Sequence, residues 1–368
     1  MSSFDLIVVG GGLVGGAIAW GAARKGARVA VLDEGDIAYR ASRGNFGLVW
    51  VQGKGAALPP YAHWSRRSAE LWPTLQNEMQ AATGVDVALR QPGGLHFCFT
   101  DQEIQARVDM MRRMHNQAGP DGARLVDRAE LRAMAPAIGD EVVGASYCPL
   151  DGHANPLKLL RALHAGLLRL GGRYLPGRTV SEIRPGADDF SVQTGMETFT
   201  GKKIVIAAGL GSARLAPMVG LDMPVKPLRG QIAITERLKP LLDYVTHTVR
   251  QTDEGSVMLG DSQEDVGLDT ATTVPVVQEI AARNLRAFPA LRDANIVRVW
   301  GALRVMTPDG FPIYEQSQAH PGAFAATCHS GVTLAGAHAL DLAPAILAGG
   351  LPPRFDAFTS RRFHVQAA

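Results

Sequence analysis

Short apolar runs alternate along the chain with glycine-rich turns and alanine-rich segments, which predicts strands alternating with helices. The first apolar run, residues 6–9, is rich in β-branched residues and has the length of a buried strand. The alanine-rich segment Gly15 to Lys25 predicts a helix that Gly26 ends. A second apolar run, Ala27 to Leu32, closes on Asp33. This order of strand, helix and strand predicts a βαβ unit with a parallel sheet.

The turn inside this unit has the spacing G-x-G-x-x-G, formed by Gly10, Gly12 and Gly15. The first glycine permits a tight turn, the second lets a pyrophosphate approach the backbone, and the third lets helix and strand pack closely. Free N–H groups at the start of the helix then attract phosphate charge. Asp33 follows roughly 20 residues later, where a carboxylate accepts hydrogen bonds from ribose hydroxyls. The unit therefore predicts a dinucleotide site for FAD or NAD, and this stretch alone does not choose between them.

Two later strands also meet a turn of small residues before a helix. Lys203 to Ala207 runs into Ala208-Gly209, and Ala323 to Thr327 is followed by His329-Ser330-Gly331. Three such sites, at the start, middle and end, predict a nucleotide domain assembled from distant pieces. The predicted fold class is α/β, with a Rossmann-type cofactor domain and an inserted antiparallel β-sheet (α+β) substrate domain. The predicted cofactor domain comprises residues 1–84, 151–221 and 301–368, and the substrate domain residues 85–150 and 222–300.

Two helices are predicted in more detail. Asn155 is predicted to cap a helix that has Pro156 at its first position and runs to about Leu170. A helix over Ala62 to Thr83 is predicted to be interrupted at Pro73.

Composition narrows the class of protein. The 368 residues are 46% hydrophobic and 20% charged, which is typical of a globular protein with room for about two domains. A net charge of +2 gives no reason to expect a nucleic-acid partner. Three scattered cysteines form neither a disulfide framework nor a metal-binding pair, so we expect no metal site and a cytoplasmic location. The apolar stretch Val332 to Leu351 contains His338 and Asp341, which favours a core helix over a membrane span.

The motifs together resemble those of the FAD-dependent amine oxidoreductases of the D-amino-acid oxidase and glycine oxidase group. Besides the N-terminal unit, the matching motifs are Ala41-Ser42, Asp151-Gly152 with Pro156, Ala208-Gly209, Arg229-Gly230-Gln231, Gly301 to Arg304 with Pro308-Asp309-Gly310, and Ser330-Gly331. The similarity extends from the first strand to the last helix and implies FAD rather than NAD. Within the group, Gly44-Asn45-Phe46-Gly47 and Arg250-Gln251-Thr252 look most like the flavin subunits of opine oxidases and cyanide-forming glycine dehydrogenases.

The resemblance also implies which residues contact FAD. They are Gly10, Gly12, Leu13 and Val14 at the pyrophosphate, Asp33 and Glu34 at the ribose, Val180 at the adenine, Ala41, Ser42, Asn45, Gly47, Leu48 and Val49 along the pyrophosphate and flavin, Ala208 and Gly209 at the middle turn, and Gly301, Arg304, Ser330, Gly331, Val332 and Thr333 near the isoalloxazine. Sarcosine oxidase relatives attach FAD to a cysteine in the stretch that corresponds to Gly301 to Arg304. Because that stretch has no cysteine here, the resemblance implies non-covalent FAD.

The implied activity is oxidation of the C–N bond of an amino acid or N-substituted amino acid, of the glycine, D-amino acid, sarcosine or opine type. Hydride would pass to flavin N5, and the imine would then be hydrolysed. Arg304 is the candidate partner of the substrate carboxylate, since a guanidinium can make two parallel hydrogen bonds, and Arg250 is a second candidate. His247 or His329 could accept the amine proton near neutral pH. Each of these four residues also has a purely structural interpretation.

Two alternative functions stay open at this point. One is a 2-hydroxy-acid flavin oxidoreductase with the same fold. The other is a flavin subunit that works only in a hetero-oligomeric dehydrogenase, with partner chains that pass electrons onward. The electron acceptor would be O2 or another molecule, and a homo-oligomer is also compatible with the sequence.

Overall fold

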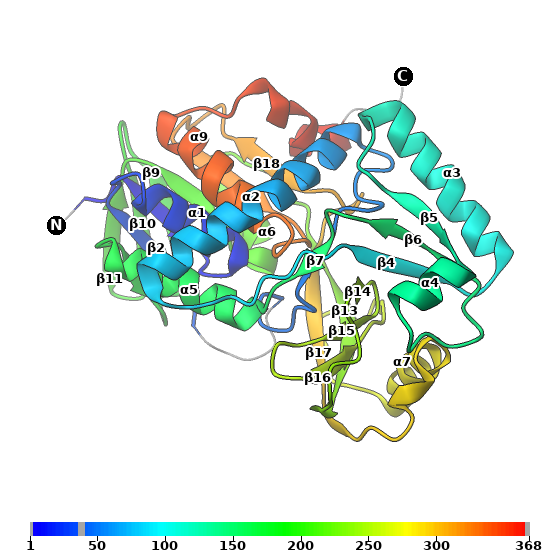
Figure 1. Cartoon of the computed structure of the whole chain (residues 1–368). Coiled ribbons are helices and arrows are strands. Elements are labelled where there is room, and N and C mark those ends of the chain that lie inside the picture. Colours follow the sequence, from blue (N-terminus) through cyan, green and yellow to red (C-terminus); the bar gives the residue numbers. More distant parts are fainter. Residues whose placement is uncertain (1–2, 36–40, 365–368) are drawn as a thin grey trace.

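A sheet of six strands lies at the centre of the larger part of the molecule (Figure 1). The computed structural model describes residues 3–35 and 41–364, so parts of the predicted cofactor domain at both ends and at 36–40 lie outside the described residues. The strand order is β18-β19-β12-β1-β2-β8. The strands are β1 (Leu6–Val9), β2 (Val29–Leu32), β8 (Arg173–Leu175), β12 (Ile204–Ile206), β18 (Ile313–Gln316) and β19 (Ala323–Thr327). All neighbours are parallel except β18 and β19, which confirms the predicted βαβ unit.

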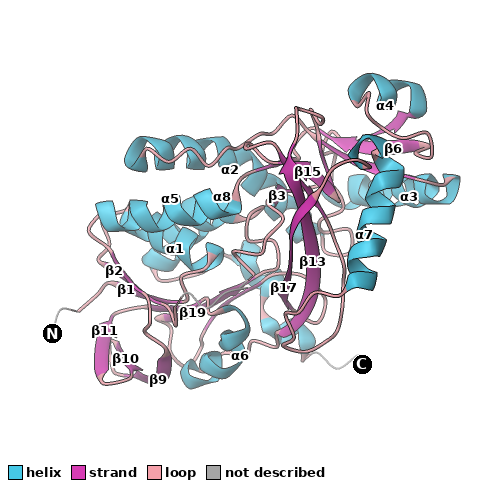
Figure 2. Ribbon diagram, turned by 90° about the horizontal axis from the view of Figure 1, so that it is seen from below, coloured by secondary structure: helices cyan, strands magenta, loops and turns pink. Residues whose placement is uncertain are grey.

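Both faces of this sheet are covered, which explains the unbroken apolar runs in its strands. Leu6 and Val8 of β1 pack into one hydrophobic cluster, whereas Ile7 and Val9 pack into another on the opposite face. On one face lie α1 (Leu13–Ala23), α2 (Pro59–Thr83), α5 (Pro156–Arg169), α8 (Ala335–Ala337), η4 (His338–Leu342) and α9 (Ala343–Ala348). On the other lie β9 (Val180–Pro185), β10 (Phe190–Thr194), β11 (Glu197–Gly201), α6 (Ser212–Leu215) and η2 (Ala216–Val219) (Figure 2).

The smaller part of the molecule contains two sheets of four strands. One has the order β15-β16-β13-β17 and is antiparallel, and the other has the order β14-β4-β6-β5. Their strands are β4 (Gly94–Cys98), β5 (Arg124–Asp127), β6 (Gly144–Cys148), β13 (Lys226–Arg237), β14 (Val245–Thr246), β15 (Val249–Gln251), β16 (Ser256–Leu259) and β17 (Ile296–Met306). Helices α3 (Asp101–Ala118), α4 (Arg128–Met134) and α7 (Val274–Ala287) accompany them. We propose that these segments form the substrate domain, with β17 running without a break across the predicted boundary at residue 300.

The remaining short elements join these parts. They are β3 (Leu48–Val49), β7 (Gly152–His153), η1 (Gly209–Gly211), η3 (Pro289–Leu291), η5 (Pro353–Phe358) and η6 (Ser360–Phe363). β3 pairs with β7 and so connects the loop after β2 to the segment before α5.

The predicted interruption at Pro73 is wrong, because α2 continues through this residue. A proline inside a helix leaves the carbonyl four residues earlier without its N–H donor. Here that carbonyl belongs to Ala69, and the side chain of Gln91 donates to it at 3.0 Å. The hydrogen bond from Gln91 thus satisfies the carbonyl that Pro73 leaves without a donor. The predicted cap of α5 is confirmed, since the Asn155 side chain accepts hydrogen bonds from the N–H groups of Leu157 and Lys158.

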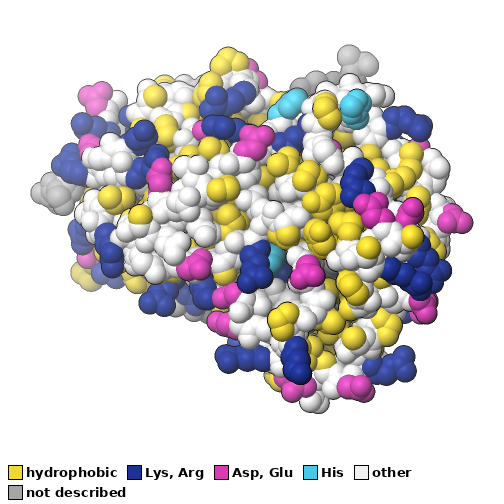
Figure 3. Space-filling model, viewed as in Figure 1, with side chains coloured by type: hydrophobic (Ala, Val, Ile, Leu, Met, Phe, Trp, Pro, Cys, Tyr) yellow, Lys and Arg dark blue, Asp and Glu magenta, His cyan; other side chains and the backbone are white. Residues whose placement is uncertain are grey.

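The apolar stretch near the C-terminus is divided among α8, η4 and α9, whose buried side chains pack on α1 and α2. None of the helices in the described ranges combines the length and apolar character that crossing a membrane requires. Basic and acidic side chains are interspersed over the face seen in Figure 3, so the net charge of +2 is not gathered into one basic patch on this face.

Candidate active site

The loops at the carboxyl ends of β1, β2, β12 and β19 enclose a cavity of about 490 Å³, which we call the cofactor cavity. Ligands of open α/β sheets bind at this edge. The sequence-predicted residues that line it are Gly10, Gly12, Leu13, Val14, Asp33, Glu34, Ala41, Ser42, Asn45, Val180, Ala208, Gly209, His329 and Gly331. The structure thus brings residues from the start, middle and end of the chain to one cavity.

The glycine turn has no room for side chains. Gly10 has a φ of 101°, and a Cβ added there would lie 2.4 Å from the carbonyl oxygen of Ala207. A Cβ on Gly15 would lie 2.0 Å from the carbonyl oxygen of Gly10. Helix α1 begins after Gly12 without a side-chain cap, and the N–H of Leu13 donates to Ser42 Oγ at 2.9 Å. The N-terminus of α1 lies at this cavity, and its partial positive charge favours an anionic group such as a pyrophosphate.

Asp33 lies at the end of β2 and is held in one orientation. Its two carboxylate oxygens accept the N–H groups of Gly11 at 2.7 Å and Gly35 at 2.9 Å. Each carboxylate oxygen can accept more than one hydrogen bond, so both can still receive a ribose hydroxyl. The helix N-terminus, the carboxylate and the cavity size together fit a dinucleotide.

A second cavity of about 290 Å³, which we call the substrate cavity, adjoins the first, and Ala41, Asn45 and His329 line both. The sequence-predicted residues that line the substrate cavity are Ala41, Asn45, Leu48, His247, Arg304, His329, Ser330, Val332 and Thr333. Thr333 Oγ1 donates to the carbonyl of Leu48 and accepts the N–H of Trp50, both at 3.1 Å. This side chain fastens the wall after β19 to the wall formed by β3.

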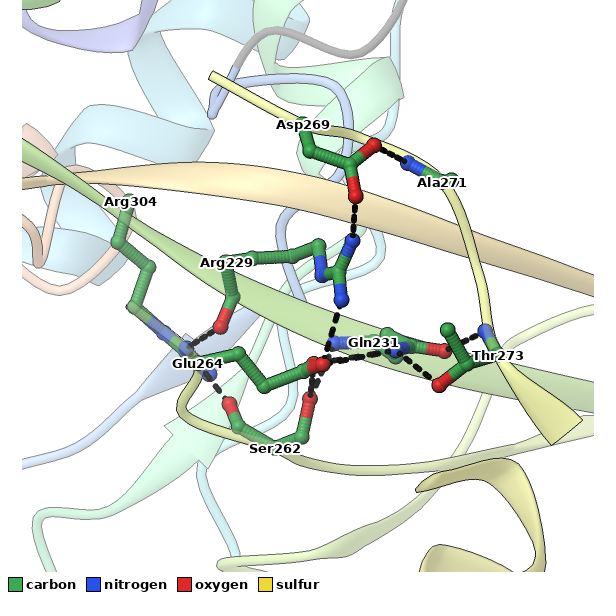
Figure 4. Close-up of polar contacts among 8 residues, drawn as sticks. All are labelled: Arg229, Gln231, Ser262, Glu264, Asp269, Ala271, Thr273 and Arg304. Atoms are coloured by element: carbon green, nitrogen blue, oxygen red, sulfur yellow. Dashed lines mark hydrogen bonds and ion pairs between the residues drawn. The ribbon is translucent and has the colours of Figure 1, made fainter. Parts of the chain in front are cut away.

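Arg304 lies on β17 with its guanidinium directly over Gly230, where an added Cβ would approach it to 2.5 Å. The guanidinium donates to the carbonyl of Ser262 at 2.7 Å (Figure 4). It also donates to the Asp261 carboxylate at 2.7 Å. A third bond reaches the carbonyl of Arg229 at 3.3 Å. Arg304 is therefore preorganised at the wall of the substrate cavity.

The wall beside Arg304 is the segment 261–273, and the Arg229-Gly230-Gln231 motif fixes it in place (Figure 4). The buried Arg229 side chain forms ion pairs with Glu264 at 2.7 Å and Asp269 at 2.5 Å. Gln231 donates to Glu264 and accepts the N–H of Thr273 at 3.0 Å. This segment supplies Asp261 and Gln263 to the substrate cavity and Thr270 to the cofactor cavity. Sequence reasoning missed these three residues, although the motif that anchors their segment was visible.

Neither candidate histidine is a strong base in this setting. The His247 ring stacks on His96 at 3.8 Å, and burial lowers its pKa well below the usual value. The charge on Lys54, and then burial, lower the pKa of His329 well below its usual value. Both rings are therefore neutral at pH 7 and bind protons only weakly.

Four predicted residues line neither cavity: Gly47, Val49, Arg250 and Gly301. The Arg250 guanidinium donates to the carbonyl of Ala154 at 3.2 Å, and burial lowers its pKa to about 10. A Cβ on Gly47 would approach this guanidinium to 3.1 Å, and a Cβ on Gly301 would lie 2.7 Å from the carbonyl of Thr270. These residues support the walls from behind.

The comparisons with known proteins identify the family of this chain. Residues 5–344 match the family described as FAD dependent oxidoreductase, and the chain belongs to that family. A relative named as one of the subunits of opine oxidase, from Agrobacterium tumefaciens (strain Ach5), is 44% identical over 370 residues, covering all of both chains. Hydrogen cyanide synthase subunit HcnC of Pseudomonas aeruginosa is 28% identical over 353 residues, covering 84% of each chain. The glycine oxidase structure from Geobacillus kaustophilus superposes with a TM-score of 0.88, at 24% identity and 96% coverage of both chains.

The family confirms FAD as the cofactor and the enzyme as an oxidoreductase, and the superposition confirms the predicted fold class. FAD, when bound, supplies a ring system that accepts two electrons from a substrate. The residues that would hold it are those lining the cofactor cavity, and the isoalloxazine end would meet His329 and Gly331 near the substrate cavity.

We expect FAD to be held without a covalent bond. Among the described residues, Cys328 lines the cofactor cavity, but burial raises the pKa of its thiol to about 12, so it keeps its proton and is a poor nucleophile. Acid precipitation of the yellow protein should leave all flavin in the supernatant. Flavin fluorescence that stays on the polypeptide in a denaturing gel would contradict this expectation, and Cys328→Ser would then identify the attachment.

Proposed function

We propose that the protein oxidises the C–N bond of an amino acid or N-substituted amino acid, and that it does so as the flavin subunit of a larger enzyme. The observation that carries this proposal is the substrate cavity, where two cationic side chains, Arg304 and Lys54, face a cavity that shares His329 with the cofactor cavity. The similarity to the opine oxidase chain, at 44% identity over the whole length, supports a substrate of the N-carboxyalkyl amino acid class.

The residues of the chain would do three things. Arg304 would hold a carboxylate of the substrate through the two guanidinium N–H groups that its bonds to Ser262, Arg229 and Asp261 leave unused. Apolar side chains of Leu228, Ile232 and Val332 would keep water away from the reacting carbon. The positive charges of Arg304 and Lys54 would favour binding of the neutral amine over its protonated form, while His247 and His329 stay neutral beside it.

Anaerobic reduction of the flavin tests this proposal. The FAD-loaded protein would be mixed with glycine, sarcosine, D-amino acids, proline, opines and 2-hydroxy acids, and loss of the visible flavin band would be followed. We expect bleaching by a secondary amine that carries a carboxylate and none by hydroxy acids. Bleaching by hydroxy acids alone would establish the alternative activity.

Two relatives are named as subunits, and this supports the proposal that partner chains carry electrons onward. The protein purified alone would then be reduced by substrate but turn over slowly in air and faster with an artificial acceptor. Rapid turnover in air would instead favour a self-sufficient oxidase. Three buried, unpaired cysteines support the further proposal that the protein works in the reducing cytoplasm.

A further inference from the structure

Lys54 is a cation of the substrate cavity that sequence reasoning did not single out. It follows β3 in a turn where its N–H donates to the carbonyl of Val51 at 2.9 Å. Its ammonium group donates to Ser330 Oγ at 2.5 Å and lies 3.2 Å from His329 Nε2. The aromatic ring of Tyr61 lies below it at 6.0 Å. The ammonium group is thus fixed at one wall of the cavity.

The charges of this cavity are not balanced. Arg304 is paired with Asp261 at 2.7 Å, so these two formal charges cancel. Within the described residues, Lys54 has no carboxylate within ion-pair distance. Burial lowers the pKa of Lys54 to about 8, so its amine is protonated in most of the molecules at pH 7. A buried charge without a counter-ion is costly, and an incoming anion would supply the missing partner.

Hydrogen bonds among the residues around Lys54 fix the position of its side chain. Asp151, fully buried, accepts hydrogen bonds from the N–H of Val51 at 2.5 Å and from the Gln52 side chain at 2.7 Å. On the other side, Ser330 Oγ accepts a hydrogen bond from the hydroxyl of Tyr61 at 3.2 Å. Because Ser330 accepts from both Lys54 and Tyr61, its own proton is free to be donated, either to His329 or to a ligand.

We propose that Lys54 and Ser330 form an anion subsite that binds a second carboxylate of the substrate while Arg304 binds the first. This inference rests on the proposed function and makes it more specific. The protein would prefer secondary amines with a carboxylate on both sides of the nitrogen over amines with one. A single subsite would bind one carboxylate of either class, so it would not discriminate between them.

A pair of dead-end ligands tests the subsite without turnover. Thiodiacetate and methylthioacetate have the same thioether core and differ by one carboxylate, and neither has an amine to oxidise. Their dissociation constants would be measured from the change in flavin absorbance of the FAD-loaded protein. We expect thiodiacetate to bind about 10- to 100-fold more tightly, the range for a hydrogen bond to a charged group. In Lys54→Met the ratio should fall to about one.

Two further variants and the pH complete the test. Lys54→Arg should keep part of the ratio, and Lys25→Met, an exposed lysine after α1, should keep all of it. The ratio should fall as the pH rises through about 8, because Lys54 then loses its proton. The other ionisable groups around Lys54 are Tyr61, Asp151, Cys328, His329 and Arg304. Burial raises the pKa of Asp151 to about 7, so Asp151 changes charge in the same pH range as Lys54. The pH dependence is therefore assigned to Lys54 only if it is absent from Lys54→Met.

The outcomes separate this inference from the proposed function. If amines bleach the flavin but Lys54→Met keeps the preference for thiodiacetate, the subsite is refuted and the activity stands. If no amine bleaches the flavin but the preference depends on Lys54, the subsite stands and the activity is refuted. If Lys54→Met does not load FAD, Lys54→Gln, which also lacks the charge, takes its place in both the ratio and the pH measurement.

Discussion

Gly15→Ala is expected to abolish FAD binding, whereas Gly16→Ala, one position further along α1, is expected to leave it intact. A methyl group on Gly15 would lie 2.0 Å from the carbonyl oxygen of Gly10, which is backbone and cannot rotate away. The turn would have to open, at an expected cost on the order of 3–5 kcal/mol of folding free energy. The same change would separate α1 from β1 and distort the helix start that faces the cofactor cavity.

Gly16 provides the matched control. A methyl group there would meet the Leu163 side chain at 3.6 Å, an ordinary contact. Alanine should even stabilise the helix by up to about 1 kcal/mol, because it loses less backbone entropy than glycine. The ratio of flavin to protein after purification and the midpoint of thermal unfolding measure both effects. A yellow, stable Gly15→Ala protein would show that the close contact between turn and helix is dispensable.

Arg304→Ala should keep FAD but weaken the binding of carboxylate substrates about 100-fold, corresponding to roughly 3 kcal/mol. Two effects contribute. The guanidinium that contacts the carboxylate is lost, and Asp261 at the cavity wall keeps only its longer ion pair with Arg283 at 3.8 Å, so it repels an anion more strongly. The double variant Arg304→Ala with Asp261→Asn removes the second effect and should recover part of the affinity.

Arg298→Ala is the control for this prediction, since Arg298 lies on the same strand but is exposed. It should bind substrate like the wild type. Substrate affinity would be taken from anaerobic titration of flavin reduction, and FAD content from the absorbance of the purified variant. An Arg304→Ala protein with unchanged substrate affinity would exclude Arg304 from substrate binding.

The parts of the fold that depend on neighbours in the sequence were predictable. The Asn155 cap rests on contacts two and three residues away, and the βαβ unit is indicated by one continuous pattern over residues 6–32; both are present. The continuity of α2 was not predictable, because it depends on Gln91, 22 residues beyond the Ala69 carbonyl that it satisfies. A propensity argument at Pro73 contains no information about such a distant donor.

The candidate site also contains residues that could be predicted from the sequence and residues that could not. Residues in the turns after strands could be assigned to the cofactor cavity, because parallel strands bring their carboxyl ends to one edge. The direction in which a single long cationic side chain points could not be predicted from the sequence. Arg250 in a matching motif lies behind the wall, while Lys54, outside any motif, faces the substrate cavity. Which of the two reaches a ligand depends on strand register and on packing between distant segments.

The order of strands in the central sheet has a consequence for how the enzyme is made. β1 leaves the ribosome first, but its neighbour β12 begins about two hundred residues later, and β19 completes the edge only near the end of synthesis. Such non-local pairing is slow, and in an emerging chain β1 can pair with β2 while its other edge stays unpaired until β12 has been made. Because Gly331 belongs to the lining of the cofactor cavity, that lining is complete only when most of the chain has been made. We therefore expect FAD to be inserted after translation ends, and its supply to limit how much of the new chain escapes aggregation.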